Sequence, residues 1–192
     1  MKVLQFLIGI GASTAFLLPQ FPVQRLGVST RSSSEEVTMG APTVQYRPAL
    51  AEEIGDIRRI LAGMLMNPLS INAENFICAE DAGALVGFGQ IRPIGGSGYE
   101  LASLHVAESH RNQGIGSSLV RQLVSDFEAT HGSAELPNLY LLTLKDTASF
   151  YKKLGFEVAS DGLPATLKAE RAVGSFLQQF FGNSLVCMRG VS

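Results

Sequence analysis

The chain has little net charge of either sign. Its 15 lysines and arginines nearly balance its 17 aspartates and glutamates, which gives a formal net charge of −2, and no basic stripe runs along the sequence. A basic face is what attracts nucleic acid or anionic lipid. We therefore expect no nucleic-acid partner and no stable membrane insertion of the mature domain.

Cysteines are scarce as well. Cys78 and Cys187 are the only two, each lies in an apolar, strand-like run, and the sequence has no CxxC or HxxxH cluster. This pattern predicts no structural zinc site and no other metal site. We interpret both cysteines as small buried hydrophobic residues; a disulfide and a nucleophile are the alternatives.

Apolar residues, in contrast, are numerous enough for a packed core. They make up 46% of the 192 residues, and charged residues make up 17%, so global disorder is not expected. The length suits one domain with an extension, and the sequence has no internal repeat.

The N-terminal extension begins like a targeting signal. Met1 and Lys2 precede an apolar run over residues 3–18, which is shorter than the roughly 20 residues that a membrane-spanning helix needs. Small residues at positions 13–15 favour a signal-peptidase cut before Phe16.

The rest of the extension has the composition of a transit peptide. Residues 16–43 are rich in Ser, Thr and Pro, and their first acidic residue is Glu35. A signal followed by such a segment resembles the bipartite presequences of plastids bounded by extra membranes. We expect a plastid location, with secretion as the alternative and a membrane anchor as a third reading. Residues 1–43 are interpreted as a targeting or disordered extension and residues 44–192 as the globular domain.

Hydrophobic periodicity predicts the elements of the globular part. Strands are expected at residues 44–48, 76–79, 84–93, 99–106, 138–144, 156–159 and 184–188, with a hairpin turn at 80–83. Helices are expected at residues 51–66, 147–154 and 167–181, and along an apolar stripe from Ile115 to Phe127. This order predicts an α/β (α+β) protein with a mixed, mostly antiparallel central sheet of about seven strands and helices on both faces.

One stretch combines a strand, a polar loop and a helix start. The strand at 99–106 leads into Arg111-Asn112-Gln113-Gly114-Ile115-Gly116 and then into the helix. Unpaired N–H groups in a helix's first turn and the positive end of its dipole favour an anion at that point. The two glycines let a phosphate approach the backbone, and the arginine adds charge-assisted contacts.

Two other kinds of glycine-rich phosphate site do not fit this stretch. A Rossmann fingerprint needs a third small residue where Leu119 stands, and an acidic residue about 20 positions further on. A P-loop needs Gly-Lys-Ser or Gly-Lys-Thr, which the chain lacks.

The six residues from 111 to 116 resemble the acetyl-CoA signature Gln/Arg-x-x-Gly-x-Gly/Ala of the GNAT acetyltransferases. Ser149-Phe150-Tyr151-Lys152-Lys153-Leu154-Gly155-Phe156 resembles the second motif of that family. The resemblance covers residues 44–189. It implies the acyl-CoA N-acyltransferase fold, acetyl-CoA as cosubstrate and transfer of its acetyl group to a primary amine. Asn112 departs from the commonest form, which has glycine there, but asparagine tolerates left-handed backbone.

The resemblance also assigns positions for acetyl-CoA. The diphosphate is expected on the backbone amides of Arg111, Asn112, Gln113, Gly114, Ile115, Gly116 and Ser117. The pantetheine arm is expected to pair with the backbone of Leu104, His105 and Val106, where that strand and strand 138–144 separate. The oxyanion donor would be an N–H near Val106. Many members have an asparagine where this chain has Leu144, so we expect that contact from backbone, Thr143 or Asp146.

Two residues are candidates for proton transfer. Tyr151 resembles the family's general acid for the CoA sulfur, and a tyrosine with a reference pKa near 10 is neutral at pH 7. Glu100 lies fourteen residues before Gly114, the offset at which several members carry the base. A carboxylate in so apolar a strand is costly unless it faces a polar cleft. The alternatives are a tyrosine packed between helix and sheet, and a glutamate that faces solvent.

The three histidines are weaker candidates. His105 and His110 are alternative bases, but we expect the first to contribute its backbone and the second to be a loop residue beside the phosphates. His131 precedes a glycine at a predicted helix end and is expected to interact with that C-terminus.

The acceptor amine is left open. The resemblance implies that its specificity lies in the first helix, residues 67–75 and the last hairpin, none of which is strongly charged. A protein N-terminus or lysine is favoured, and a small amine is possible. The alternatives to an enzyme are a non-catalytic acyl-CoA-binding regulatory module and a nucleotide-binding protein of another fold. Residues 161–183 could cover the acceptor site or support a dimer, so we expect a monomer or homodimer.

Overall fold

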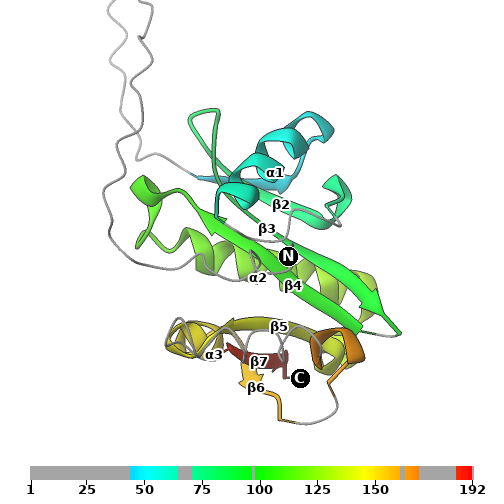
Figure 1. The fold of residues 1–192 in the computed structure, drawn as a ribbon. Coiled ribbons are helices and arrows are strands. Elements are labelled where there is room, and N and C mark those ends of the chain that lie inside the picture. The colour runs from blue at the N-terminus through cyan, green and yellow to red at the C-terminus, as the bar shows by residue number, and fades with distance from the viewer. Residues whose placement is uncertain (1–43, 65–70, 97, 161–162, 169–184, 192) are drawn as a thin grey trace, which may run out of the picture.

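A seven-stranded sheet organises the domain in the order β1-β2-β3-β4-β5-β7-β6 (Figure 1). This computed structural model describes residues 44–64, 71–96, 98–160, 163–168 and 185–191. The strands are Gln45–Pro48 (β1), Phe76–Asp81 (β2), Ala84–Gly95 (β3), Gly98–Val106 (β4), Leu139–Leu144 (β5), Phe156–Val158 (β6) and Leu185–Gly190 (β7). Every neighbouring pair is antiparallel except β4 and β5, which are parallel. The predicted mixed, mostly antiparallel sheet is confirmed.

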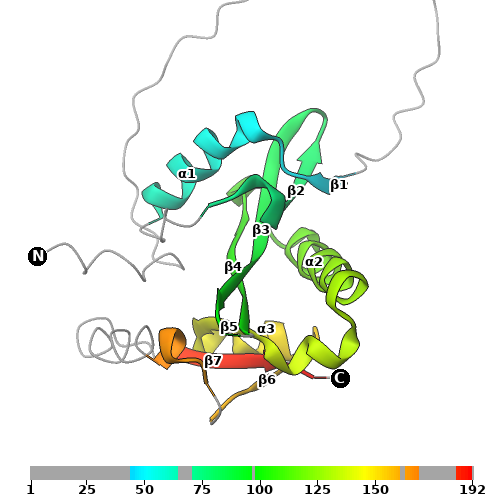
Figure 2. The ribbon, with the colours of Figure 1, turned by 90° about the vertical axis from the view of Figure 1, so that its right-hand side faces the viewer.

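Helices cover both faces of this sheet because the side chains of its strands alternate. Phe76 and Cys78 of β2 pack with helix α1 (Ile54–Gly63), whereas Ile77 and Ala79 pack with helix α2 (Ile115–His131). Figure 2 shows α1 and α2 on opposite sides of β3 and β4. A short helix, α3 (Ala148–Lys152), follows β5, and residues 165–168 form one more helical turn.

Several predicted boundaries were wrong by a few residues. The first helix starts as a 3₁₀ turn at Ala51–Glu53, and its α-helical part ends at Gly63. The hairpin turn is shorter than predicted, because β2 runs to Asp81 and β3 begins at Ala84. Helix α3 ends at Lys152, before Gly155, which takes a left-handed φ of 87°.

Part of the predicted chain lies outside the described residues. This holds for the extension over residues 1–43, for residues 65–70 and 169–184, and for 161–162. Within the described residues, no helix combines the length and apolar content needed to cross a membrane. Cys78 and Cys187 are both buried thiols without a disulfide, which confirms their interpretation.

The two halves of the sheet join over a very short length. β4 and β5 pair only at Tyr99 with Leu139 and at Glu100 with Tyr140. β5 then runs beside β7 from Tyr140 to Leu144. Beyond Glu100, β4 therefore leaves β5, and within the described part of the chain its remaining residues pair only with β3. The predicted separation of these two strands is confirmed.

Candidate active site

The separation of β4 and β5 leaves an open backbone edge. The edge comprises residues 101–106 of β4 on the side that faces β5. Backbone N–H and C=O groups need partners when they are buried. An extended chain inserted between the two strands would supply them, as an added strand does. Leu104, His105 and Val106 lie on this edge, where the sequence predicted backbone contacts.

The loop after β4 has the backbone conformation that a phosphate site needs. Asn112 takes a left-handed φ of 63°, and Gly114, the N-cap of α2, takes a φ of 80°. No side chain caps the N-terminus of α2, so N–H groups of its first turn stay open to a ligand. Arg111 is exposed and donates from Nε to the carbonyl oxygen of Val106, 3.2 Å away. The expected tolerance of Asn112 for left-handed backbone is confirmed.

The other predicted binding residues have contacts within the protein. Gln113 donates from Nε2 to the carbonyl oxygen of Ser109, 3.2 Å away. The side chain of Ile115 is buried in the core, and Ser117 is half-buried in the first turn of α2. The side chain of Leu104 also packs into the core beside Gly89, so only its backbone is available to a ligand.

The loop and the tyrosine-bearing helix meet in space. A Cβ atom built on Gly116 would lie 3.6 Å from Cγ2 of Val106 and 3.8 Å from Cζ of Phe150. The end of β4, the start of α2 and helix α3 therefore converge at this glycine. Gly116 and Phe150, which are 34 residues apart in sequence, therefore lie close together in the structure.

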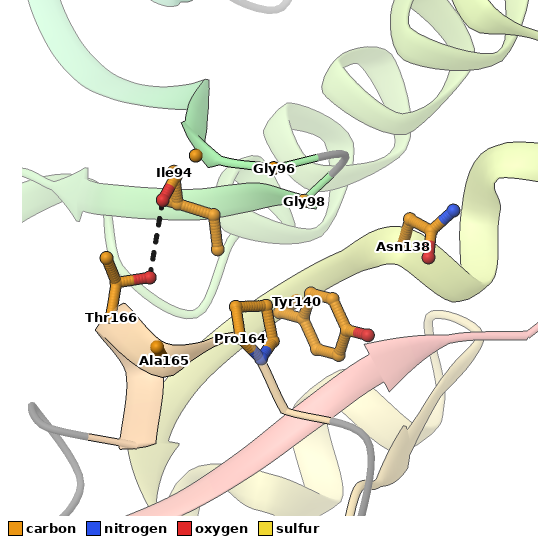
Figure 3. A pocket seen from close by; sticks show the side chains of 9 residues that line it. Ile94, Gly96, Gly98, Asn138, Tyr140, Pro164, Ala165 and Thr166 are labelled. Carbon is orange, nitrogen blue, oxygen red and sulfur yellow. Dashed lines mark hydrogen bonds between the residues drawn. The ribbon is translucent and has the colours of Figure 1, made fainter.

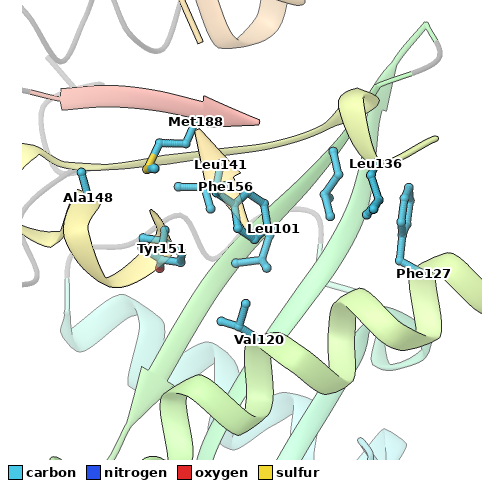
Figure 4. Close-up of a cluster of buried hydrophobic side chains, with 10 residues drawn as sticks. Leu101, Val120, Phe127, Leu136, Leu141, Ala148, Tyr151, Phe156 and Met188 are labelled. Carbon is cyan, nitrogen blue, oxygen red and sulfur yellow. The ribbon is translucent and has the colours of Figure 1, made fainter. Parts of the chain in front are cut away.

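Tyr151 follows Phe150 and lies in the core on the α2 side of β4. It is 9% exposed and belongs to a cluster with Leu101 and Val120 (Figure 4). Its ring meets those of Phe150 and Phe156 edge to face, with centroids 4.9 and 6.2 Å apart. Burial raises the pKa of Tyr151 to about 12, so its hydroxyl carries a proton at neutral pH.

Glu100 lies on the opposite face of β4 and is paired with an arginine. Arg92 of β3 donates to its Oε2 from Nε at 2.9 Å and from Nη2 at 2.7 Å. The two side chains are 13% and 7% exposed. This ion pair offsets the cost of burying the carboxylate, so Glu100 is neither a solvent-facing residue nor a lone charge. Among the described residues, Arg92 Nη1 and Glu100 Oε1 have no hydrogen-bond partner.

A buried amide lies two residues from Arg92 on the same strand. Gln90 is 0% exposed and donates from Nε2 to Oγ of Ser103, 3.0 Å away. Its Oε1 is buried without a hydrogen-bond partner among the described residues. Ser103 takes a φ of 57° where the β3–β4 register shifts, so it forms a bulge in β4.

Arg92 and Gln90 were not predicted from the sequence, although their residue types were a signal. Arg92 lies opposite Glu100 only because the register shifts between Pro93 and Gly95. In an otherwise apolar strand, polar residues two positions apart on one face indicate a site.

The histidines differ in their surroundings. His105 Nδ1 lies 3.1 Å from Sδ of Met64; burial and, to a smaller extent, the charge of Arg111 lower its pKa, so the ring is neutral at pH 7. His110 contacts Asp81 at 3.2 Å. His131 Nδ1 contacts the carbonyl oxygen of Phe127 at 3.2 Å, which confirms its helix-end role. Among the described residues no group of three His, Cys, Asp or Glu could hold a metal ion.

A pocket of about 460 Å³ lies between the β3–β4 turn, β5 and the helical turn at residues 165–168 (Figure 3). Tyr140, which lines it, is the register partner of Glu100. Thr166 closes one side and donates from Oγ1 to the carbonyl oxygen of Ile94, 3.3 Å away. The pocket is lined by Ile94, Gly95, Gly96, Gly98, Asn138, Tyr140, Pro164, Ala165 and Thr166.

Known structures share this fold at low sequence identity. N-acetylglutamate synthase of Neisseria gonorrhoeae, in complex with coenzyme A and L-arginine, superposes with a TM-score of 0.55 at 20% identity over 78% of this chain. The chain covers only 34% of that enzyme. Rv2747 of Mycobacterium tuberculosis, in a complex that contains CoA, gives 0.54 at 18% identity over 77% of this chain and 99% of its own. Escherichia coli ElaA gives 0.57 at 11% identity over 78% and 100%.

Sequence comparison gives a match to a family profile over part of the chain. No curated protein matches the chain. Residues 72–158, which run from the turn before β2 to the end of β6, match the profile of the acetyltransferase (GNAT) domain. The chain therefore has the acyl-CoA N-acyltransferase fold, and residues 72–158 carry its match to the GNAT acetyltransferase domain.

Proposed function

We propose that the protein is an N-acetyltransferase that moves the acetyl group of acetyl-CoA to a primary amine. One observation carries the proposal: Gly116, Val106 and Phe150 meet at a single point. An anion-binding helix start, an open strand edge and a proton-bearing tyrosine are thereby neighbours. These are the three elements that the binding of a CoA thioester and the departure of its thiolate require.

In this proposal the loop and the strand edge bind CoA. Backbone amides of residues 111–117 hold the diphosphate, and Arg111 adds its charge through the guanidinium nitrogens not used on Val106. The pantetheine arm pairs with residues 104–106 as an extra strand. The thioester then lies in the gap between β4 and β5. Tyr151 is on one face of the sheet at this gap, and Glu100 is on the other.

The chemistry needs one protein group that accepts a proton and one that donates a proton. The acceptor ammonium loses a proton to Glu100, directly or through a water, and its nitrogen forms a bond to the thioester carbon. As the carbon–sulfur bond breaks, the nitrogen releases its second proton to solvent and the thiolate takes the proton of Tyr151; solvent then returns a proton to Tyr151 and accepts the one on Glu100. Support for these roles is the protonated state of Tyr151 and the partner-free Oε1 of Glu100 among the described residues.

Acceptors of three kinds fit the proposal. A protein N-terminus or a lysine side chain is favoured, and a small amine is possible. One structure of similar fold is an N-acetylglutamate synthase, whose name describes acetylation of an amino acid. That likeness is one of fold, so the acceptor must be measured.

Two measurements on the full-length protein test the proposal. CoA should bind in calorimetry, and Tyr151→Phe should lower kcat by about a hundredfold or more while CoA affinity changes less than threefold. Tyr46→Phe, which changes another tyrosine on β1, is the matched control and should retain full activity. Absence of CoA binding would refute the proposal.

A non-catalytic CoA-binding module is the alternative. It would bind CoA with the same affinity but release no free thiol with any amine, and Tyr151→Phe would then change nothing. Thiol release measured over a panel of amines separates it from the enzyme.

We also propose a plastid location for the protein, on the basis of the composition of residues 1–43. Those residues, fused to a fluorescent protein, should direct it into a plastid bounded by extra membranes. Secretion of the fusion would contradict the proposal.

A further inference from the structure

The ion pair of Arg92 and Glu100 leaves polar atoms of both side chains without hydrogen-bond partners among the described residues. Both guanidinium nitrogens that contact the carboxylate share one oxygen, Oε2. Arg92 Nη1 and Glu100 Oε1 thus remain as one donor and one acceptor with no partner among the described residues. The pair as a whole carries no net charge, so it favours a ligand that offers a donor to Glu100 and an acceptor to Arg92.

Gln90 adds a second acceptor to this group. Gln90 and Arg92 are two residues apart on one strand, so their side chains leave the same face about 7 Å apart along it. The Oε1 atom of Gln90 is buried and unpartnered among the described residues. A buried carbonyl without a donor is costly, and exchanging N and O of the amide would only leave an N–H without a partner instead.

Together these atoms match the amine end of an α-amino acid unit. An ammonium group has three N–H donors and can bridge Glu100 Oε1 and Gln90 Oε1. The carbonyl or carboxylate next to it is an acceptor for Arg92 Nη1. A lysine side chain has no carbonyl beside its amine, so it would leave Arg92 Nη1 without a partner.

We infer that Arg92, Glu100 and Gln90 bind the acceptor through an α-amino group and the carbonyl attached to its α-carbon, and so select α-amines over lysine side chains. This inference rests on the proposed acetyltransferase function. Free amino acids and polypeptide N-termini share the chemistry. The pocket beside Tyr140, of about 460 Å³, gives room for the side chain of the acceptor residue.

Acceptors that share one side chain test the inference on the wild-type, full-length protein. Methionine, methioninamide and 3-(methylthio)propylamine differ only at the carboxyl group. A lysine-free peptide with a free N-terminus and an Nα-acetylated peptide with one lysine complete the set. The thiol of released CoA gives kcat/KM for each acceptor.

At least one α-amine that carries a carbonyl should exceed both 3-(methylthio)propylamine and the lysine peptide by tenfold or more in kcat/KM. A higher kcat/KM for methionine than for the peptide with a free N-terminus identifies free amino acids as the acceptor. A higher kcat/KM for the peptide identifies polypeptide N-termini. Equal or better use of the decarboxylated amine or of lysine overturns the inference but leaves the proposed function intact. CoA binding without any acetylation overturns both.

Arg92→Lys tests the role of the guanidinium. A lysine keeps a positive charge opposite Glu100 but lacks the second donor group. KM for the best α-amine should rise at least tenfold, while KM for 3-(methylthio)propylamine and the affinity for CoA change less than twofold. Arg47→Lys, in the cluster that Arg47 forms with Glu53 and Glu80, should alter neither KM. A similar change in KM for both amines would overturn the inference, and a thermal unfolding curve shows whether each variant is folded.

Discussion

Two partly buried arginine–glutamate clusters of the described residues, one around Arg47 and one around Arg92, differ in how many of their polar atoms have hydrogen-bond partners. At the edge of the sheet, Arg47 contacts Glu80 through Nε and Nη2, and Glu53 through Nη1 and Nη2. Its Nη1 also donates to the carbonyl oxygen of Pro48. Every nitrogen of this guanidinium therefore has a partner, whereas Nη1 of Arg92 has none among the described residues.

This difference separates a structural cluster from a candidate site. The Arg47 cluster ties β1 to β2 and to the turn before α1, so it connects elements of the fold. The Arg92 cluster joins only β3 and β4, which already pair along the sheet. Charged groups that are buried but incompletely paired are costly, and such groups are typical of binding and catalytic sites.

The largest effect should come from removing the carboxylate of the open cluster. Glu100→Gln should lower kcat/KM by about a hundredfold because the acceptor ammonium loses its base. Glu53→Gln, the same change in the saturated cluster, should leave kcat/KM within twofold. Steady-state kinetics at saturating acetyl-CoA measure both. If both variants keep wild-type rates, neither cluster takes part in the reaction.

A second prediction concerns the binding of CoA at the start of α2. Gly116→Ala should weaken CoA binding about tenfold, because the added methyl group points toward Val106 and Phe150, where the ligand is proposed to pass. The fold should not suffer, since those contacts are 3.6 and 3.8 Å and alanine favours a helix.

The matched control is Gly55→Ala in α1, where a Cβ atom would meet nothing within 4 Å. It should stabilise the protein slightly and leave CoA affinity unchanged. Calorimetry and thermal unfolding of both variants measure the two effects. Equal CoA affinity for both variants would argue against the proposed path of the pantetheine arm.

Breaking the saturated cluster should cost stability instead of activity. Arg47→Met leaves Glu53 and Glu80 without their shared partner and should lower the free energy of unfolding by about 1 kcal/mol. Arg59→Met removes an exposed pair with Asp56, whose side chains are 79% and 64% exposed, and should have no measurable effect. Urea unfolding compares the two. Equal decreases in the free energy of unfolding would show that the partly buried ion pairs of Arg47 stabilise the fold no more than the exposed pair of Arg59.

The smallest effect should be on the pH dependence of stability. The hydrogen bond from Arg47, with a second from the backbone of Leu50, lowers the pKa of Glu53 below its usual 4.5, although burial opposes this. The stabilisation is thus complete above about pH 4.5 and is lost as the pH falls through the lowered pKa. The free-energy difference between wild type and Glu53→Gln should shrink below pH 4.5; a constant difference would contradict this.

The sequence predicted the parts of the fold that depend on local signals. The stripe from Ile115 to Phe127 and the alternation in β2 are readable because a helix or strand repeats within a few residues. The loop was readable for the same reason, since Gly114 supplies a left-handed φ that few other residues accept.

The environment of the candidate base could not be predicted in the same way. Glu100 was expected to need a polar cleft, but the observed compensation comes from Arg92 on the next strand. Strand register is a non-local property: a count back from Gly95 and Gly98 places Leu101 opposite Arg92, and the irregularity between Pro93 and Gly95 brings Glu100 there instead. The contact between Gly116 and Phe150 depends likewise on tertiary packing, so no local pattern announces it.

The two-residue junction between β4 and β5 has a consequence for hydrogen exchange. Amide protons held in a strand ladder exchange slowly, and those without a partner exchange quickly. Within residues 101–106, amides that face β3 should therefore retain hydrogen far longer than those that face β5. A ligand that fills the gap would slow exchange only at the amides that face β5. Deuterium uptake by residues 101–106 therefore measures the fraction of the protein that has bound ligand, and no catalytic turnover is needed.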